Sequence, residues 1–210
     1  MGLGHWYNEN VVPRFIRCAC SAPGIMGIRA QVVPLASGAV FEIGCGGGIN
    51  QALYDDSRVT SIAGIDPSAK GLEFAQAAAA KRHRAVCFKA ASGESIPYDD
   101  VRFDSAVCTF TLCSVQSPAA TLAELYRILK PRGRLLFAEH GRAPDSGVQA
   151  WQDRINPLWQ RLAGGCQITR PITPAMVDAG FAVQRLGAKY LEKTPRIAGW
   201  FEWGVATKPG

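Results

Sequence analysis

The sequence predicts an α/β fold with a doubly wound, mostly parallel sheet of seven strands that ends in an antiparallel hairpin. Short apolar runs alternate with helical patterns over the first two thirds of the chain. These runs are continuously apolar, as in strands covered on both faces, and the first one ends in a cluster of glycines. A chain of 210 residues buries roughly 70% of its unfolded surface, so we expect a single domain.

Five strands and two helices account for the first two thirds. The strands are expected at residues 40–43, 59–65, 85–89, 103–110 and 135–138. Apolar residues recur at helical spacing over residues 67–82, which predicts the helix that follows the second strand. Another helix begins at Ser117 and Pro118, because serine caps helix N-termini and proline suits the first helical position.

The last third of the chain has a different pattern. A helix expected over residues 148–162 is interrupted at Pro157, and a short helix capped by Thr173 follows it. Two late strands are expected at residues 181–188 and 200–207. Because apolar residues alternate with others in the second of them, we expect the pair to join the sheet as a hairpin.

Composition restricts the class of protein and its partners. Arginines interrupt the most apolar early stretch, so no run reaches the roughly 18 apolar residues of a membrane span. We find no export signal and expect a cytoplasmic protein.

The seven cysteines form no CxxC pair, so no metal site is expected. The net charge of +6 comes from scattered residues, which predicts no nucleic-acid partner. Weak peripheral membrane contact through the N-terminal segment stays open.

The stretch VFEIGCGGG at residues 40–48 is the strongest candidate for a ligand site. A strand that runs directly into Gly44, Gly46 and Gly48 lets the backbone turn sharply and approach a ligand without Cβ atoms in the way. Ile49 stands where a dinucleotide-binding loop needs its third glycine. The alternative is a tight turn that binds nothing.

Two acidic residues favour a particular ligand. Glu42 precedes the glycines, where a carboxylate repels phosphates but receives a ligand ammonium or orders the loop by hydrogen bonds. Asp66 ends the second strand, where a carboxylate accepts both hydroxyls of a ribose or caps the helix before Pro67. A nucleoside with an amino-acid head group satisfies both acids, and S-adenosylmethionine is such a molecule.

Several motifs resemble those of the class I S-adenosylmethionine-dependent methyltransferases. They are FEIGCGGG, GIDPS from Gly64, ASGESIP from Ala91, FDSAVCTFTLCSV from Phe103 and LAELYRILKPRGRLLFAEHGRAP from Leu122. TLCSV, EHGRAP and LAGGCQITRPI are similar to a narrower group, which includes quinone-biosynthesis methyltransferases and methyltransferase-like proteins that act on thiols or lipids. The resemblance implies a Rossmann-like fold and methyl transfer to a small apolar or lipid-like acceptor: a thiol, hydroxyl, amine or quinone precursor. S-adenosylhomocysteine is the other product.

The resemblance also implies roles for parts of the chain. Residues 1–36 form a helical cap segment, residues 37–145 a cofactor-binding core and residues 146–210 a part that shapes the acceptor site. The implied cofactor-binding residues are Tyr7, Glu42, Gly44, Cys45, Gly46, Gly48, Asp66, Pro67, Ser92, Gly93, Glu94, Cys108 and Thr109. Tyr7 closes over the cofactor or packs in the core. Ser92 stands where the family often has aspartate, and Arg132 replaces a common glycine, which we interpret as a neutral surface change.

Glu139 and His140 are the candidate catalytic residues. They follow the fifth strand, and ligands of open α/β sheets bind outside the carboxyl ends of the strands. Imidazole titrates near neutral pH, so His140 is the candidate base that takes a proton from a thiol or hydroxyl. The alternative is a structural hydrogen bond, because methyl transfer to sulfur or nitrogen can proceed by positioning and desolvation alone.

Two other functions stay open at this stage. A nicotinamide-dependent oxidoreductase is disfavoured by Ile49 and Glu42. A binding module that keeps the cofactor site without catalysis is compatible with the same motifs. The sequence leaves monomer and homodimer as alternatives.

Overall fold

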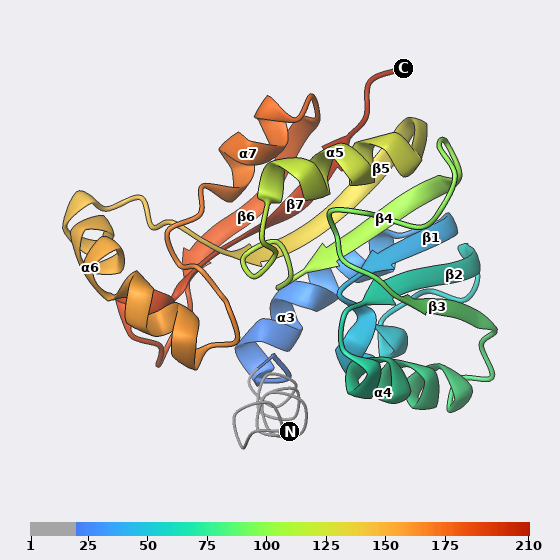
Figure 1. Cartoon of the computed structure of the whole chain (residues 1–210), viewed down its shortest axis with the longest axis horizontal. Coiled ribbons are helices and arrows are strands. Elements are labelled where there is room, and N and C mark those ends of the chain that lie inside the picture. The colour runs from blue at the N-terminus through green and yellow to red at the C-terminus, as the bar shows by residue number, and fades with distance from the viewer. Residues whose placement is uncertain (1–19) are drawn as a thin grey trace.

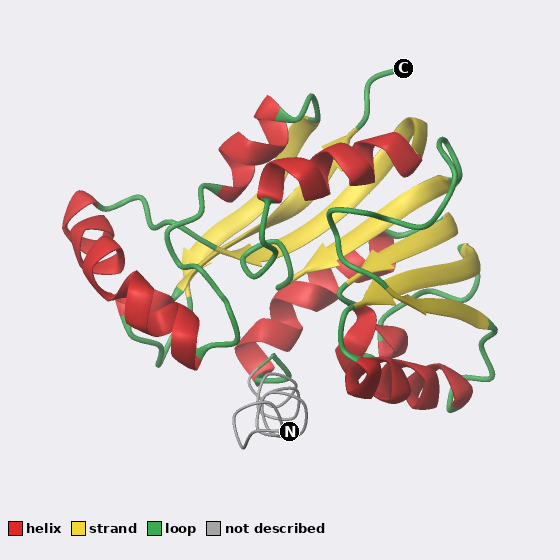
Figure 2. Ribbon diagram, viewed as in Figure 1, coloured by secondary structure: helices red, strands yellow, loops and turns green. Residues whose placement is uncertain are grey.

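The computed structural model describes residues 20–210, which form one seven-stranded sheet with helices on both faces (Figures 1 and 2). The strand order is β3-β2-β1-β4-β5-β7-β6. The first five strands of this order are parallel, whereas β7 runs antiparallel to both β5 and β6. The doubly wound sheet and its antiparallel hairpin are therefore confirmed.

The strands fall close to the expected apolar runs. They are β1 (Gly38–Ile43), β2 (Val59–Asp66), β3 (Val86–Ala90), β4 (Phe103–Thr109), β5 (Leu129–His140), β6 (Ala182–Tyr190) and β7 (Trp200–Thr207). Only β5 begins much earlier than expected. Leu129 pairs with Phe103, and the next pair is Arg134 with Ser105, so residues 130–133 bulge out of an otherwise regular ladder.

Two of the helices begin at serine caps, of which the sequence predicts Ser117 but not Ser68. The helices are α3 (Pro23–Val32), α4 (Ala69–Ala80), α5 (Pro118–Ile128), α6 (Ser146–Leu162) and α7 (Ile172–Asp178). The hydroxyl of Ser68 accepts the N–H of Gly71 at the start of α4, and Ser117 does the same for α5. These caps satisfy N–H groups that have no partner within the helix.

The expected interruption of α6 is wrong. The helix continues through Pro157, which leaves the carbonyl of Asp153 without its helical N–H donor. Both residues are exposed, so water can satisfy the freed carbonyl.

The expected capping role of Thr173 is also wrong. The residue before α7 is Pro171, and Thr173 lies within the helix. Its hydroxyl donates to the carboxylate of Glu202 on β7 instead. Thr173 therefore fastens α7 to the sheet.

Arg132 is not a neutral replacement for glycine. Its φ of 62° lies in the left-handed region, where a residue with a Cβ atom costs roughly 1–2 kcal/mol. The turn keeps this conformation because the N–H of Arg132 donates to the carbonyl of Lys208 at 3.1 Å. The substitution therefore stores backbone strain in the bulge of β5.

Two apolar cores lie on the two faces of the sheet. One joins α5 and α7 to the sheet and includes Leu122, Leu125, Met176 and Phe137. The other includes Ile28 and Val32 of α3 together with Val40 and Leu136 of the sheet. The central strands of the sheet, β1, β4 and β5, are thus covered on both faces, as their continuously apolar runs predict.

The N-terminal region is only partly described. Tyr7, and the membrane contact expected of the segment around it, lie outside the described residues. Within residues 20–210, every helix is too short or too polar to cross a bilayer.

Candidate active site

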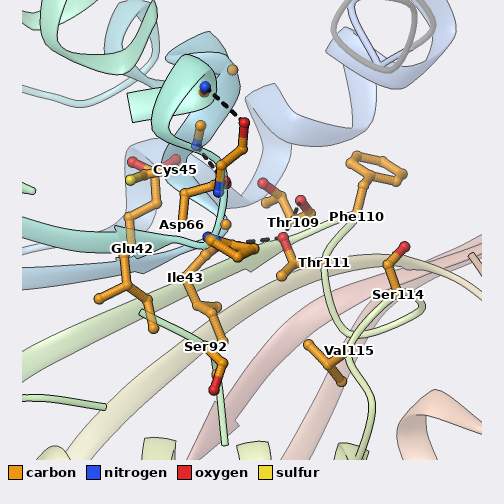
Figure 3. Close-up of a pocket in the computed structure, with 18 of the residues that line it drawn as sticks. Glu42, Ile43, Cys45, Asp66, Ser92, Thr109, Phe110, Thr111, Ser114 and Val115 are labelled. Carbon is orange, nitrogen blue, oxygen red and sulfur yellow. Dashed lines mark hydrogen bonds between the residues drawn. The ribbon is translucent and has the colours of Figure 1, made fainter. Parts of the chain in front are cut away.

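A cavity of about 950 Å³ lies along the carboxyl ends of four neighbouring strands (Figure 3). The sheet order brings the segments that follow β3, β2, β1 and β4 side by side, and each of them lines the cavity. The strand order reverses between β1 and β4, where ligands of doubly wound sheets bind. Cys20, Arg29 and Gly164 complete the lining from other parts of the chain.

The glycine turn after β1 (residues 44–48) brings the backbone to the cavity. Gly44 and Gly48 adopt φ angles of 69° and 62°, and Cys45–Gly47 form a single 3-10 turn between them. A Cβ atom on Gly46 would lie 2.6 Å from Cγ of Asp66. Glycine is required there by this close approach, and the turn lines the cavity as the sequence predicts.

Asp66 is fixed at the end of β2 by two backbone hydrogen bonds. Its Oδ2 accepts the N–H of Gly46 at 3.0 Å, and Oδ1 accepts the N–H of Ser68 at 2.8 Å. Burial raises the pKa of this carboxyl, although both hydrogen bonds oppose the shift. Each carboxylate oxygen keeps a further lone pair, so Asp66 can accept hydroxyl groups of a ligand in the cavity.

Glu42 orders the segment that follows the glycine turn. It is 3% exposed, and its carboxylate accepts hydrogen bonds from Asn50 at 2.9 Å and Tyr54 at 2.9 Å, with Gln51 donating at 3.3 Å. Burial raises the pKa of Glu42. Both carboxylate oxygens already have donors, which favours the expected ordering role over capture of a ligand ammonium.

Arg29 of α3 is a cavity residue that the sequence analysis missed. Its Nη1 donates to Asn50 at 2.8 Å and to Thr109 at 2.6 Å, and its guanidinium lies 4.6 Å from the centre of the Phe110 ring. Its buried Nε has no hydrogen-bond partner among the described residues. The sequence does place this arginine between the apolar Ile28 and Val32. A charged residue at such a buried position needs polar partners, which indicates a site.

The 91–94 loop after β3 closes one end of the cavity. Ser92, Gly93 and Glu94 all line it. The Glu94 carboxylate accepts the N–H groups of Gln116 at 2.8 Å and Ser117 at 3.0 Å, which ties this loop to the start of α5. Burial raises the pKa of Glu94, but these hydrogen bonds outweigh burial and hold it below its usual value.

Glu139 holds the loop after β4 (residues 110–117) in place from outside the cavity lining. It is fully buried, and its carboxylate accepts backbone N–H groups from Thr111 at 2.9 Å, Leu112 at 3.0 Å and Cys113 at 3.3 Å. Burial raises its pKa, against these three hydrogen bonds. Glu139 is not part of the cavity lining, so its carboxylate shapes the loop rather than facing a ligand.

His140 and Cys108 also lie outside the lining. The His140 ring stacks on Phe201 with centroids 5.1 Å apart, and its Nδ1 lies 3.4 Å from the sulfur of Cys166. The Cys108 thiol is buried 3.3 Å from Glu139. Successive side chains of a strand point to opposite faces, so the side chain of Thr109 reaches the cavity and that of Cys108 does not.

The structure therefore brings most of the predicted site residues together. Those on the lining are Glu42, Gly44, Cys45, Gly46, Gly48, Asp66, Pro67, Ser92, Gly93, Glu94 and Thr109. Lining residues that the sequence analysis did not identify include Arg29, Phe110, Thr111, Ser114 and Gly164. In the described part of the chain, no three His, Cys, Asp or Glu side chains are placed to hold a metal ion.

The fold and the cavity at the carboxyl ends of its strands are those of a ligand-binding, doubly wound α/β domain, and sequence comparison identifies its family. A family model for a methyltransferase domain matches residues 41–137. Thiol S-methyltransferase TMT1B of Homo sapiens is 36% identical over 186 residues, which cover 84% of this chain and 72% of that protein. The ubiquinone biosynthesis O-methyltransferase of Alkalilimnicola ehrlichii is 31% identical over 146 residues, 59% of each chain.

A solved structure shows the same fold at low sequence identity. It is the N-methyltransferase NodS from Bradyrhizobium japonicum in complex with S-adenosylhomocysteine, with a TM-score of 0.69 and 14% identity. The match covers 97% of this chain and 99% of NodS. The chain belongs to the class I S-adenosylmethionine-dependent methyltransferases, and its cofactor is S-adenosylmethionine. Neither the oxidoreductase nor the non-catalytic module is supported.

Proposed function

We propose that the chain transfers the methyl group of S-adenosylmethionine to the sulfur of a small apolar thiol. The observation that carries this proposal is the chemistry of the lining next to β4. Residues 109–116 contribute Thr109, Phe110, Thr111, Ser114, Val115 and Gln116 to the cavity. None of these side chains titrates near neutral pH, so this end offers an apolar surface and hydroxyl groups but no proton acceptor.

A thiol needs less help from a base than a hydroxyl does. Thiols have a pKa of about 8.5 and phenols of about 10, so a thiol supplies roughly thirty times more anion at neutral pH. Arg29 adds a buried positive charge to the lining, and an opposite charge nearby favours the ionised form of an acceptor. The thiol S-methyltransferase relative also supports a sulfur acceptor.

The cofactor fits the part of the cavity over β3, β2 and β1. The glycine turn would hold its amino-acid part, Asp66 would accept the ribose hydroxyls, and residues 92–94 would border the adenine, since all of them line this part of the cavity. When bound, S-adenosylmethionine supplies a methyl group activated by its positive sulfur. We assign Glu139 a positioning role through the 110–117 loop, and methyl transfer needs no proton transfer to His140.

The test compares acceptors that share one carbon skeleton. Thiophenol and phenol are supplied at pH 7 with S-adenosylmethionine, and the methylated products are quantified by mass spectrometry. We expect the thiol to react at least a hundredfold faster, with a pH profile that shifts with the pKa of each thiol tried. The Asp66→Ala variant, which loses the cofactor contact, is the control for background reaction.

Two results would overturn this assignment. Phenol methylated as fast as thiophenol would move the acceptor to the hydroxyl class and would favour a quinone precursor. A pH profile that ignores the acceptor's own pKa and disappears in His140→Gln would identify His140 as a base.

A further inference from the structure

Two cysteines lie together behind the rim of the cavity. Cys113 belongs to the 110–117 loop, and Cys166 belongs to the loop between α6 and α7. The N–H of Gln167 donates to the carbonyl of Cys113 at 2.8 Å, which holds the two loops against each other. The Cys113 thiol is within hydrogen-bonding reach of the Cys166 sulfur. Ser114, which follows Cys113, and Gly164, which lies two residues before Cys166, both line the cavity.

The groups around Cys166 favour a thiolate. The Cys113 thiol donates to its sulfur and His140 Nδ1 lies 3.4 Å away, and these contacts outweigh burial and lower the pKa of Cys166. The buried Arg170 guanidinium is the nearby permanent cation, and its own position is fixed by the carbonyls of Leu112 and Val115. Trp159 acts on Cys166, and the Ser114 hydroxyl lies 3.5 Å from the Cys113 sulfur. Cys20 at the start of the described chain and Glu139 on β5 also interact electrostatically with this cluster.

The two thiols differ in access. Cys166 is partly exposed, whereas Cys113 is only 3% exposed and lies behind it. Burial and its hydrogen bond to Cys166 raise the pKa of Cys113, so it remains a protonated donor while Cys166 is the anion. An accessible thiolate with a protonated thiol behind it is the arrangement of an attacking and a resolving cysteine.

We propose that Cys166 is a site of thiol–disulfide exchange with small organic disulfides and that Cys113 is its resolving thiol. The Cys166 sulfur attacks one sulfur of the disulfide, whose S–S bond breaks and releases one thiolate that takes a proton from water. Cys113 then gives its proton to solvent and attacks the Cys166 sulfur, which breaks the mixed S–S bond and releases a second thiolate that solvent protonates. The two cysteines are oxidised to one disulfide while the small disulfide is reduced to two thiols.

The resulting disulfide covalently joins two loops that both border the cavity. This modification site is independent of the methyl acceptor, because neither cysteine lines the cavity itself. Its test accordingly measures sulfur chemistry rather than methyl transfer.

The first experiment measures the reactivity of individual cysteines by mass mapping of peptides. The whole protein is treated briefly with iodoacetamide at pH 5.5, where an ordinary thiol is about 0.1% ionised. We expect Cys166 to be alkylated at least tenfold faster than the exposed Cys87, which is the internal reference. In the His140→Gln variant, we expect the alkylation rate of Cys166 to fall toward that of Cys87, while the alkylation rate of Cys87 itself stays unchanged.

The second experiment supplies bis(2-hydroxyethyl) disulfide at pH 7 and maps the products without reduction. The wild-type protein is expected to give a Cys113–Cys166 cross-link, whereas Cys113→Ser stops at one mixed disulfide on Cys166. The Cys87→Ser variant should behave as wild type, and circular dichroism establishes that each variant is folded. Equal alkylation of Cys166 and Cys87 in the folded protein would overturn the proposal. A Cys166→Ser variant that consumes the disulfide at the wild-type rate would also overturn it.

Discussion

The two ends of the cavity are built in different ways. Over β2 and β1 the site consists largely of backbone, with the Gly46 N–H bonded to Asp66 and no room for a Cβ atom between them. Over β4 the loop is held by buried charged side chains from distant parts of the chain, Glu139 on β5 and Arg170 before α7. The end proposed to hold the cofactor is therefore sensitive to added atoms, and the end proposed to hold the acceptor is sensitive to removed ones.

The largest effect is expected from the acceptor end. Glu139→Ala leaves three backbone N–H groups without their acceptor in a buried site, which costs about 3–5 kcal/mol of unfolding free energy. Urea denaturation followed by circular dichroism measures this loss. Glu139→Gln keeps one acceptor oxygen and should lose less. If the two variants are equally stable, the carboxylate does not support the loop as described.

Gly46→Ala tests whether the proposed cofactor end is sensitive to an added atom. Its new Cβ atom would meet Cγ of Asp66 at 2.6 Å, so we expect S-adenosylhomocysteine to bind about a hundredfold more weakly, about 2.7 kcal/mol. Gly27→Ala is the matched control, because nothing lies within 4 Å of a Cβ atom at that position. Calorimetric titration of both variants measures the difference. Equal affinities would show that the turn tolerates side chains.

A smaller effect is expected when only the charge of Asp66 is removed. Asp66→Asn keeps the size of the side chain and one acceptor oxygen, but its amide nitrogen cannot accept the N–H of Gly46 or Ser68. It also weakens the hydrogen bonds that an ionised carboxylate makes to hydroxyl groups. We expect roughly a tenfold loss of affinity for S-adenosylhomocysteine, equivalent to about 1.4 kcal/mol. The same titration measures it, and unchanged affinity would remove Asp66 from the binding site.

The smallest effect concerns Glu94, which joins the two ends. Its folded pKa is lowered, so its contribution to stability is present above the unfolded pKa near 4.5 and is lost as the pH falls through the folded value. After allowance for solvent screening, we expect Glu94→Gln to cost about 0.5–1 kcal/mol at pH 7. Unfolding curves of both proteins should converge as the pH is lowered below 4.5. A difference in unfolding free energy between the two proteins that persists at low pH would show that Glu94→Gln destabilises the protein through packing rather than through the lost charge.

The same contrast explains how far the sequence predicts the site. The proposed cofactor end is encoded locally: Gly44, Gly46 and Gly48 lie in one turn, and Asp66 ends the next strand. Arg29 was missed because its partners Asn50 and Thr109 are 21 and 80 residues away. No local pattern marks such contacts.

The fold shows the same limit at individual residues. Apolar runs predicted the first five strands, because strands covered on both faces require them, whereas alternation predicted the last strand. Whether Pro157 breaks a helix depends on exposure of the freed carbonyl, and whether Arg132 is neutral depends on its φ angle. Both are properties of the folded chain that residue type alone does not determine.

The register shift between strands β6 and β7 has a consequence for the behaviour of the protein at high concentration. β6 forms one edge of the sheet, and its pairing with β7 shifts between Arg185 and Gly187. Exposed Arg185 and Lys189 add positive charge along the same edge. Bulges and charges of this kind hinder the addition of a strand from another molecule. Concentrated solutions of the folded protein should therefore resist aggregation from this edge.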